Sequence, residues 1–320
     1  MSAPSPMPAS TTPTATDQPA AALRAAEEAL LRTAGVAVER HEAPGPGGGS
    51  LHYLTCGEGE PLLLLHGRGN AAALFTPIFA PLAAQRRVIA LDLPGWGLSD
   101  KPIFTGRTAQ DALRFWMDGA LALLDHLGLD RVDLLGHSMG GFTALGLALD
   151  HPDRVRSLLL ADAGGLGRAA ALDVRLYFWL KPERLHRWLG RDFMARVLAQ
   201  DGAKRSVPRD EAFEFTWQVT TQQAVIPSGA RAFDRWVDLF GVHLNFLDRL
   251  LTLEQPTLLL WGEHDRVAPY ADALRARKLI RHGRLVVFTG CGHSPFTERP
   301  ADFARVVNVW LNGGGAPSRV

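Results

Sequence analysis

The sequence predicts an α/β fold, in which a mostly parallel sheet of about eight strands carries helices on both faces. Apolar strand-like runs alternate with helical segments along most of the 320 residues, which is the pattern expected when helices connect parallel strands. Residues 62–65 are all leucine, as in a central strand buried on both faces. Between 161 and 255, roughly ninety residues without a convincing buried strand break this alternation and predict an inserted subdomain.

The expected elements follow in chain order. A helix is expected over residues 21–34, because Leu23, Ala26 and Leu30 recur at helical spacing. Two antiparallel strands over 36–42 and 51–56 are joined through a Pro-Gly-rich stretch. The alternating part then has helices at 74–84, at 109–127 and after Ser138, and strands at 62–66, 87–91, 132–136, 155–161, 256–261 and 285–288.

Composition predicts the domain boundaries. Residues 1–20 are rich in Pro, Ala, Ser and Thr, with Asp17 as their only charge, so they cannot bury enough apolar area to offset the entropy of ordering. They also lack the basic and apolar regions of a secretory signal. We expect a disordered tail over 1–20, an α/β core formed by 21–163 and 251–313, a helical cap over 164–250 and a flexible tail over 314–320.

The inserted segment is rich in aromatic residues. Helices are expected there over 172–180, 182–199, 208–225 and 229–240. Most of these aromatic side chains are expected to pack the cap onto the core. An aromatic lid also leaves an apolar pocket for substrate. The candidates for substrate contact are Phe178, Trp179, Trp217 and Phe246.

The stretch from Gly136 to Gly140 reads Gly-His-Ser-Met-Gly, with an apolar strand before it and a helix after it. In this context Ser138 is expected in a strained turn that exposes its hydroxyl. The N-terminus of the following helix favours negative charge developing there. An ordinary helix N-cap is the alternative role for Ser138, but the strand–turn–helix context favours a nucleophile.

A carboxylate and a histidine follow two later strands. Asp265 lies in the turn after residues 256–261, and His293 lies in the loop after 285–288. Both therefore emerge at the sheet edge where open α/β proteins bind ligands. His293 would take the Ser138 proton while Asp265 fixes the tautomer of the imidazole. Asp162, which follows the strand at 155–161, is the rival acid, and a loop histidine without a catalytic role is the alternative for His293.

The strand at 62–66 leads into His66-Gly67-Arg68-Gly69-Asn70, which is similar to a loop that supplies an oxyanion-hole amide. We expect the backbone N–H groups of Arg68 and Met139 to be the two donors. Behind them, His66, Gly67 and His137 are expected to orient the loop and the turn around Ser138. Asp92 is expected to hold its own Pro-Gly turn through side-chain to backbone hydrogen bonds.

Together these motifs resemble the α/β-hydrolase superfamily, in its serine-triad branch with a helical cap. The resemblance extends from residue 36 to 311, and it implies the α/β-hydrolase fold. The Gly-x-x-Asp pattern of this branch favours Asp265 over Asp162 as the acid. Epoxide hydrolases and haloalkane dehalogenases carry Asp where this chain has Ser138, and proline iminopeptidases usually show a Gly-Gly-Ser-Trp-Gly turn. The motifs that carry the resemblance are His66-Gly67, the stretch 92–100, the turn around Ser138, the turn 262–265 and Gly292-His293.

The predicted activity is that of a cofactor-free serine hydrolase, which cleaves a small to medium hydrophobic carboxylic ester through an acyl-enzyme on Ser138. No metal is expected, because the sequence contains no His-x-x-x-His or Cys-x-x-Cys pair. No nucleotide cofactor is expected either, because no phosphate-binding glycine loop follows the first parallel strand.

Three other activities stay open. A C–C bond hydrolase of aromatic ring-cleavage products has a loop like residues 66–70, but its usual Trp after the catalytic histidine is replaced here by Ser294. Acyl transfer or perhydrolysis is possible because other acceptors compete with water at an acyl-enzyme. A non-catalytic ligand-binding protein is the alternative from another class, and the complete nucleophile, acid and base set argues against it.

Composition also limits the partners. The formal net charge of +1 and the pI near 7.9 give no footprint for nucleic acid or an anionic membrane. The two cysteines, Cys56 and Cys291, form no disulfide framework and fit a reducing cytoplasm. No apolar run approaches the length of about 18 residues that a membrane span needs. The expected partner is a small hydrophobic substrate, and the cap could also serve as a homodimer surface.

Overall fold

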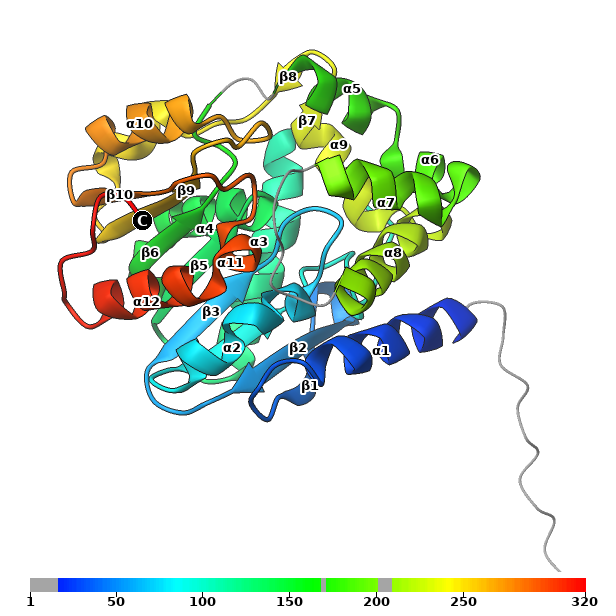
Figure 1. Ribbon diagram of the computed structural model, residues 1–320, viewed down its shortest axis with the longest axis horizontal. Coiled ribbons are helices and arrows are strands. Elements are labelled where there is room, and N and C mark those ends of the chain that lie inside the picture. Colours follow the sequence, from blue (N-terminus) through cyan, green and yellow to red (C-terminus); the bar gives the residue numbers. More distant parts are fainter. Residues whose placement is uncertain (1–16, 168–170, 201–208) are drawn as a thin grey trace, which may run out of the picture.

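The computed structural model describes residues 17–167, 171–200 and 209–320 (Figure 1). Eight strands form one sheet in the order β1-β2-β4-β3-β5-β6-β9-β10. β2 (Ser50–Cys56) pairs antiparallel with both β1 (Glu39–Pro44) and β4 (Arg87–Leu91). The other pairings are all parallel, which confirms the predicted fold class. They run from β4 successively through β3 (Pro61–Leu65), β5 (Val132–His137), β6 (Val155–Ala161), β9 (Thr257–Gly262) and β10 (Gly283–Phe288).

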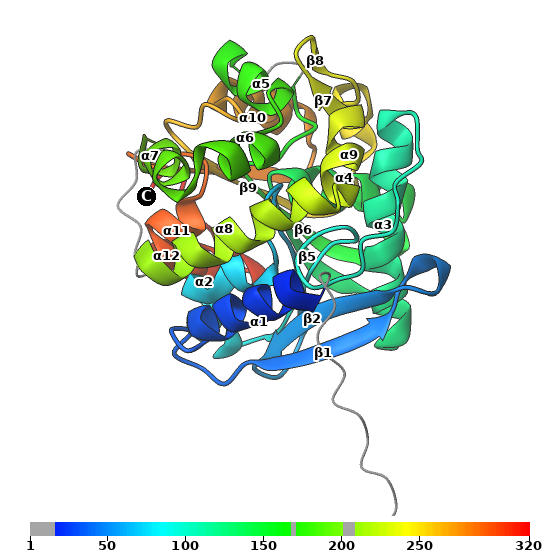
Figure 2. The ribbon, with the colours of Figure 1, turned by 90° about the vertical axis from the view of Figure 1, so that its right-hand side faces the viewer.

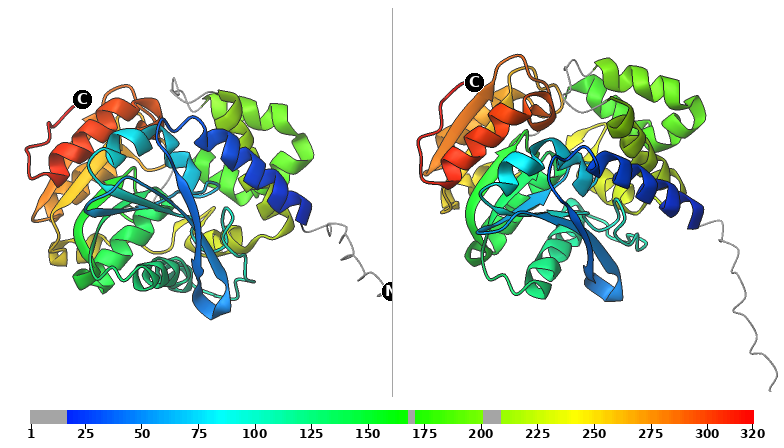
Figure 3. Two further views of the ribbon diagram at one scale, coloured as in Figure 1. Left: turned by 90° about the horizontal axis from the view of Figure 1, so that it is seen from below. Right: turned by 60° about the horizontal axis from the view of Figure 1, so that its bottom comes forward.

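The centre of the sheet is apolar because helices cover both faces. Residues 62–65 of β3 and 258–260 of β9 are fully buried leucines. On one face α2 (Thr76–Ala83) packs against α12 (Pro300–Leu311), and on the other α3 (Ala109–His126) packs against α4 (Met139–Asp150) (Figure 3). Two further helices follow β9 and β10, namely α10 (Tyr270–Leu279) and the short α11 (Pro295–Glu298).

The N-terminal helix begins earlier than the sequence predicts. α1 spans Asp17–Leu31 and lies against α8 (Arg209–Val225) (Figure 2). Residues 17–20, which were predicted to be part of a disordered tail, therefore form its first turn. Pro19 is tolerated there because the first turn leaves its N–H groups unpaired in any case, and the Pro19 carbonyl accepts a hydrogen bond from Gln222 Nε2 at 2.9 Å. The rest of that predicted tail, 1–16, lies outside the described residues.

The C-terminal residues are also more ordered than predicted. Val320 donates its N–H to the Val287 carbonyl and accepts the N–H of Thr289, both at 2.9 Å, and the Ser318 carbonyl accepts the N–H of Val287 at 3.1 Å. β10 is an edge strand, and such a strand offers unpaired backbone groups. The segment 314–320, predicted to be flexible, is therefore attached to the sheet edge.

The segment between β6 and β9, our proposed cap over residues 164–250, is mainly helical. The predicted helix over 182–199 is in fact two helices, α6 (Pro182–Leu189) and α7 (Arg191–Gln200), because Gly190 adopts a φ of 83° between them. The helix predicted over 229–240 ends early. It is α9 (Ser228–Trp236), and a hairpin of β7 (Val237–Asp238) and β8 (Gly241–Val242) follows it.

The remaining cap helix is α5 (Leu172–Trp179). Figure 1 shows α5 to α9 gathered on one side of the sheet. None of the described helices combines the length and the apolar composition that crossing a membrane requires.

Candidate active site

Ser138 lies in the sharp turn between β5 and α4. Its φ of 53° and ψ of −114° are unusual for a residue with a side chain, and such strain persists only where the surroundings impose it. The Ser138 N–H donates to the Ala161 carbonyl at 3.1 Å, and its own carbonyl accepts the N–H of Phe142 and of Gly164. The turn is therefore fixed by β6 and α4.

Two glycines allow this turn to sit tightly against β3. A Cβ atom on Gly140 would lie 2.1 Å from the Leu65 carbonyl oxygen, and one on Gly136 would lie 2.3 Å from the Gly140 oxygen. Both contacts involve backbone, which cannot move aside without disturbing the sheet. Positions 136 and 140 thus require residues without a side chain.

The structure brings Ser138, His293 and Asp265 together. His293 Nε2 lies 3.0 Å from Ser138 Oγ, and His293 Nδ1 lies 2.8 Å from Asp265 Oδ2. The other carboxylate oxygen of Asp265 accepts the N–H groups of Val267 and Ala268, at 2.7 and 3.0 Å. With the Nδ1 N–H donating a hydrogen bond to this fixed carboxylate, Nε2 can accept the proton of the Ser138 hydroxyl.

Asp162, the rival acid, is buried beside this group, but its carboxyl is hydrogen-bonded to the end of β9. Its Oδ1 accepts the Gly262 N–H at 2.8 Å, and the carboxyl is fully buried. Burial, and then the nearby charge of Asp265, raise the pKa of Asp162 well above its ordinary value. Burial and the charge of Asp265 thus favour the protonated form of Asp162, while Asp265 holds His293.

The loop after β3 packs directly against Ser138. His66 Nε2 accepts the Leu93 N–H at 3.0 Å, so Nδ1 carries the proton and donates it to the Gly67 carbonyl at 2.8 Å. A Cβ atom on Gly67 would lie 3.0 Å from Ser138 Cβ. The backbone of Arg68 follows next, and Met139 opens α4, where N–H groups lack partners within the helix. The two expected oxyanion donors thus follow directly in the chain on Gly67 and on Ser138.

His137 connects the turn of Ser138 to the loop of His293. Its Nε2 donates to the His293 carbonyl at 2.8 Å. Burial, together with the neighbouring His293, lowers the pKa of His137 to about 3, so the ring stays neutral. Its ring also stands 4.9 Å from the ring centroids of His293 and Phe296. His137 therefore fixes the backbone of the catalytic candidate His293.

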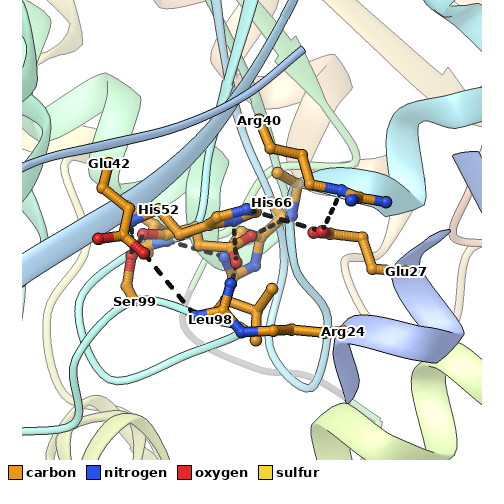
Figure 4. Close-up of polar contacts among 12 residues, drawn as sticks. Arg24, Glu27, Arg40, Glu42, His52, His66, Leu98 and Ser99 are labelled. Carbon is orange, nitrogen blue, oxygen red and sulfur yellow. Dashed lines mark hydrogen bonds and ion pairs between the residues drawn. The ribbon is translucent and has the colours of Figure 1, made fainter. Parts of the chain in front are cut away.

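A buried polar network lies behind the loop (Figure 4). His52 of β2 places Nδ1 at 3.0 Å from Asp92 Oδ2 and Nε2 at 3.6 Å from Glu27 of α1. Asp92 accepts the N–H groups of Ala72 and Leu98, at 2.6 and 2.7 Å. Asp92 therefore holds its own turn, as expected, and also the residues just after the loop. The parts played by Glu27 and His52 were not predicted, because nothing local in the sequence indicates where α1 packs.

This network predicts that stability depends on pH. Burial is the main cause that raises the pKa of Glu27 from 4.5 to about 7. Burial alone would lower the pKa of His52, but Asp92 and Glu27 raise it above 6.5. Groups with raised pKa values in the folded state stabilise it at low pH and lose that contribution as pH rises. We expect the contribution of Glu27 to the free energy of unfolding to fall by about 3 kcal/mol between about pH 5 and pH 8.

The Glu27→Gln variant, measured by urea unfolding across this pH range, should lack this contribution, so its stability relative to that of the unchanged protein should rise by about 3 kcal/mol. Glu28→Gln is the matched control, because Glu28 lies next along α1 but is exposed. A Glu27→Gln profile as steep as that of the unchanged protein would contradict this assignment.

A cavity of about 470 Å³ lies between the core and the cap, and Ser138 and His293 are in its wall. Of the four aromatic residues predicted to contact substrate, only Phe178 lines it. Trp179 is half exposed, Trp217 lies elsewhere on α8, and Phe246 packs against Phe142 with ring centroids 5.2 Å apart. The aromatic side chains that do line it with Phe178 are Tyr177, Phe233 and Trp236.

The Arg68 side chain crosses from the core to the cap in the wall of this cavity. Its Nη2 lies 2.7 Å from Glu183 Oε2 of α6, and both side chains are largely buried. The guanidinium carbon is 5.0 Å from the ring centroids of both Phe178 and Phe233, at the distance of cation–π contacts. The charge of Arg68 is therefore compensated inside the cap.

The structure also shows where a metal could be held. Two groups of described residues bring three possible ligands within 4.8 Å of one another, Glu27–His52–Asp92 and Asp162–Asp265–His293. In each group the histidine Nδ1 already lies at hydrogen-bonding distance from an aspartate. Neither histidine needs a metal to hold its ring, and we assign no metal to either group.

Comparison with known proteins places these features in a family context. The family model for the alpha/beta hydrolase fold matches residues 60–300. The chain is similar to the 2-hydroxy-6-oxo-2,4-heptadienoate hydrolase of Pseudomonas putida, with 31% identity over 272 residues that cover 83% of this chain and 94% of that protein.

Solved structures show the same likeness. A membrane phospholipase A, described as a bacterial virulence factor, has a TM-score of 0.72 and 26% identity, and the match covers 92% of both chains. A thermophilic esterase from Thermogutta terrifontis has a TM-score of 0.68 and 26% identity, over 86% of this chain and 98% of that one.

Proposed function

The chain belongs to the α/β-hydrolase family, and within that family we propose that it is a serine hydrolase of neutral, hydrophobic carboxylic esters. The observation that carries the proposal is the hydrogen-bonded series from Ser138 Oγ through His293 to Asp265 in the cavity wall. This is the arrangement that activates a serine hydroxyl for attack on a carbonyl carbon.

In the proposed reaction, His293 Nε2 takes the hydroxyl proton as Ser138 Oγ bonds to the ester carbonyl carbon. The N–H groups of Arg68 and Met139 stabilise the resulting oxyanion, each by about 3 kcal/mol in the transition state. The C–O bond to the alcohol then breaks, and the alcohol leaves with the proton from His293. Water, deprotonated by His293, releases the acid from the acyl-enzyme and restores Ser138.

The charges in the cavity wall favour a neutral substrate. The described cations that line the cavity are Arg68, paired with Glu183 at 2.7 Å, and Arg266, paired with Asp173 at 2.6 Å. A carboxylate group on a substrate bound by Arg68 would have to displace Glu183, which would leave a largely buried carboxylate uncompensated. The names of two of the similar structures, a phospholipase and an esterase, agree with ester hydrolysis.

The second candidate is hydrolysis of a carbon–carbon bond in a ring-cleavage product. The likeness to the 2-hydroxy-6-oxo-2,4-heptadienoate hydrolase supports it. The same serine, histidine and aspartate would serve that reaction, so the two candidates differ mainly in the substrate that the cavity accepts.

Steady-state kinetics separate the two. We expect p-nitrophenyl esters, tested from acetate to octanoate, to be cleaved with a kcat/KM about 100-fold or more above that for 2-hydroxy-6-oxo-2,4-heptadienoate. The Ser138→Ala variant provides the blank for both assays. A higher kcat/KM for the dienoate would select the second candidate instead.

A further inference from the structure

α5 is apolar on both of its faces. Its inner face, with Val174, Tyr177 and Phe178, lines the cavity. Its outer face carries Leu172, Leu176, Trp179 and Leu180 of the following turn, which recur at helical spacing and are all exposed. Helices that are apolar all round normally bury both faces. Within the described residues, the outer face of α5 is left uncovered.

Two more exposed aromatic residues lie on elements next to α5. Trp188 of α6 is 82% exposed and Phe240, in the turn between β7 and β8, is 86% exposed. Arg175 Nη1 donates to the Leu239 carbonyl at 3.1 Å and so attaches this hairpin to α5. Figures 1 and 2 both show α5, α6 and β8 together at one end of the molecule. We call these six exposed residues of α5, α6 and the hairpin the outer cap face.

The outer cap face is also basic. Residues 172–191 contain five Lys or Arg, of which Lys181 pairs with Asp234 and Arg191 with Glu214, both at 2.6 Å. Arg184 and Arg187 flank Trp188 on the exposed side of α6. The described part of the chain forms no ion pair with either arginine. Arg184 and Arg187 are therefore two uncompensated positive charges beside Trp188, which the near-zero net charge of the whole chain does not reveal.

We propose that the outer cap face docks on an anionic lipid surface and that the ester substrate is taken from that surface, the second part resting on the function proposed above. Trp and Leu beside Arg are the residues that bind helices to lipid headgroups and acyl chains. Clustered arginines add attraction to anionic lipids. In a symmetric dimer the uncompensated Arg184 and Arg187 of both copies would be brought together at the interface, which favours anionic lipid over a second copy of the chain.

The cavity reaches the surface close to the outer cap face. Asp173 and Arg266 line the cavity and are both exposed, and their ion pair joins α5 to the loop after β9. Leu172 of the outer cap face is the neighbour of Asp173 in the chain. A lipid surface seated on the outer cap face would thus lie beside the entrance to the cavity, and an apolar acyl chain could pass into it with little exposure to water.

Vesicle flotation with the full chain tests the docking. We expect binding to vesicles of phosphatidylcholine with phosphatidylglycerol, and weaker binding to phosphatidylcholine alone. The variants Trp179→Ser/Trp188→Ser/Phe240→Ser and Arg184→Gln/Arg187→Gln should each bind at least about tenfold more weakly. The variant Ile103→Ser/Leu251→Ser/Leu274→Ser removes exposed apolar side chains elsewhere and should bind like the unchanged protein.

Hydrolysis of p-nitrophenyl acetate in solution controls for folding, and its rate should be the same in all four proteins. Absence of vesicle binding by the unchanged protein, or equal loss in the control variant, would overturn the docking proposal. A dimer that the first variant abolishes, without vesicle binding, would assign the face to a second copy instead. Docking without hydrolysis of any ester would overturn only the proposed function and the lipid-borne ester.

Discussion

The Ser138→Ala variant is expected to lose about 10⁶-fold in kcat/KM for ester hydrolysis, because removal of a serine nucleophile costs about this much in serine proteases. Thermal unfolding of the variant should match that of the unchanged protein, since the turn is held by backbone hydrogen bonds to Ala161, Phe142 and Gly164. The measurement is kcat/KM with the best p-nitrophenyl ester.

Ser294→Ala is the matched control for this experiment. Ser294 also lines the cavity and follows His293, but its hydrogen bonds to Glu298 and Thr297 are made by its backbone. Its kcat/KM should stay within about tenfold of the unchanged value. Equal losses in the two serine variants, or a persistent rate in Ser138→Ala, would contradict the role of Ser138.

The second large effect concerns the two buried aspartates. Asp265→Asn should lower kcat/KM by about 10⁴-fold, because an amide cannot stabilise the imidazolium and favours the wrong tautomer of His293. Asp162→Asn should lower it by less than about tenfold. The new amide oxygen can still accept the Gly262 N–H, and a neutral amide replaces a carboxyl whose pKa is raised well above its ordinary value.

Comparing the two variants at pH 7 makes each the control for the other, since both replace a buried carboxyl by an amide of the same shape. The reverse order of losses would show that Asp162 is the partner of His293. Similar losses of about 10⁴-fold would show that the two carboxyls act as a unit, against our assignment of separate roles.

The parts of the fold that local sequence determines were predictable. The strand over 155–161 matches β6 residue for residue, because an apolar run between polar turns has few other interpretations. The turn around Ser138 was predictable for a related reason, since the glycines on either side of it have a steric requirement that only their residue type meets. His293 and Asp265 were predicted from their places after strands that end at the same sheet edge.

The cap was predicted less well because its apolar residues do not distinguish inside from outside. Phe178 and Trp179 are neighbours on α5, yet one lines the cavity and the other faces out. Both faces of that helix are apolar, so periodicity cannot tell which one meets the core. Gly190 divides the predicted helix over 182–199 through a positive φ, and a lone glycine in a helical pattern is often tolerated.

Polar pairs between residues far apart in the chain could not be predicted from local sequence patterns. Arg68 and Glu183 are 115 positions apart, yet they meet at 2.7 Å. Glu27 reaches His52 only because α1 packs against the core, and Glu27 has the spacing of an ordinary helical residue. These pairs depend on tertiary packing, which sequence patterns over a few turns do not record.

Covalent labelling tests the central claim most directly. The unchanged protein is treated with diethyl p-nitrophenyl phosphate, which a serine activated by an adjacent base attacks at phosphorus with loss of p-nitrophenolate. We expect one diethylphosphoryl group per chain on the peptide that contains Ser138, with loss of ester hydrolysis in proportion, and no labelling of Ser138→Ala. Full hydrolytic activity in protein labelled at Ser138, or labelling of another residue that alone abolishes activity, would contradict the proposed nucleophile.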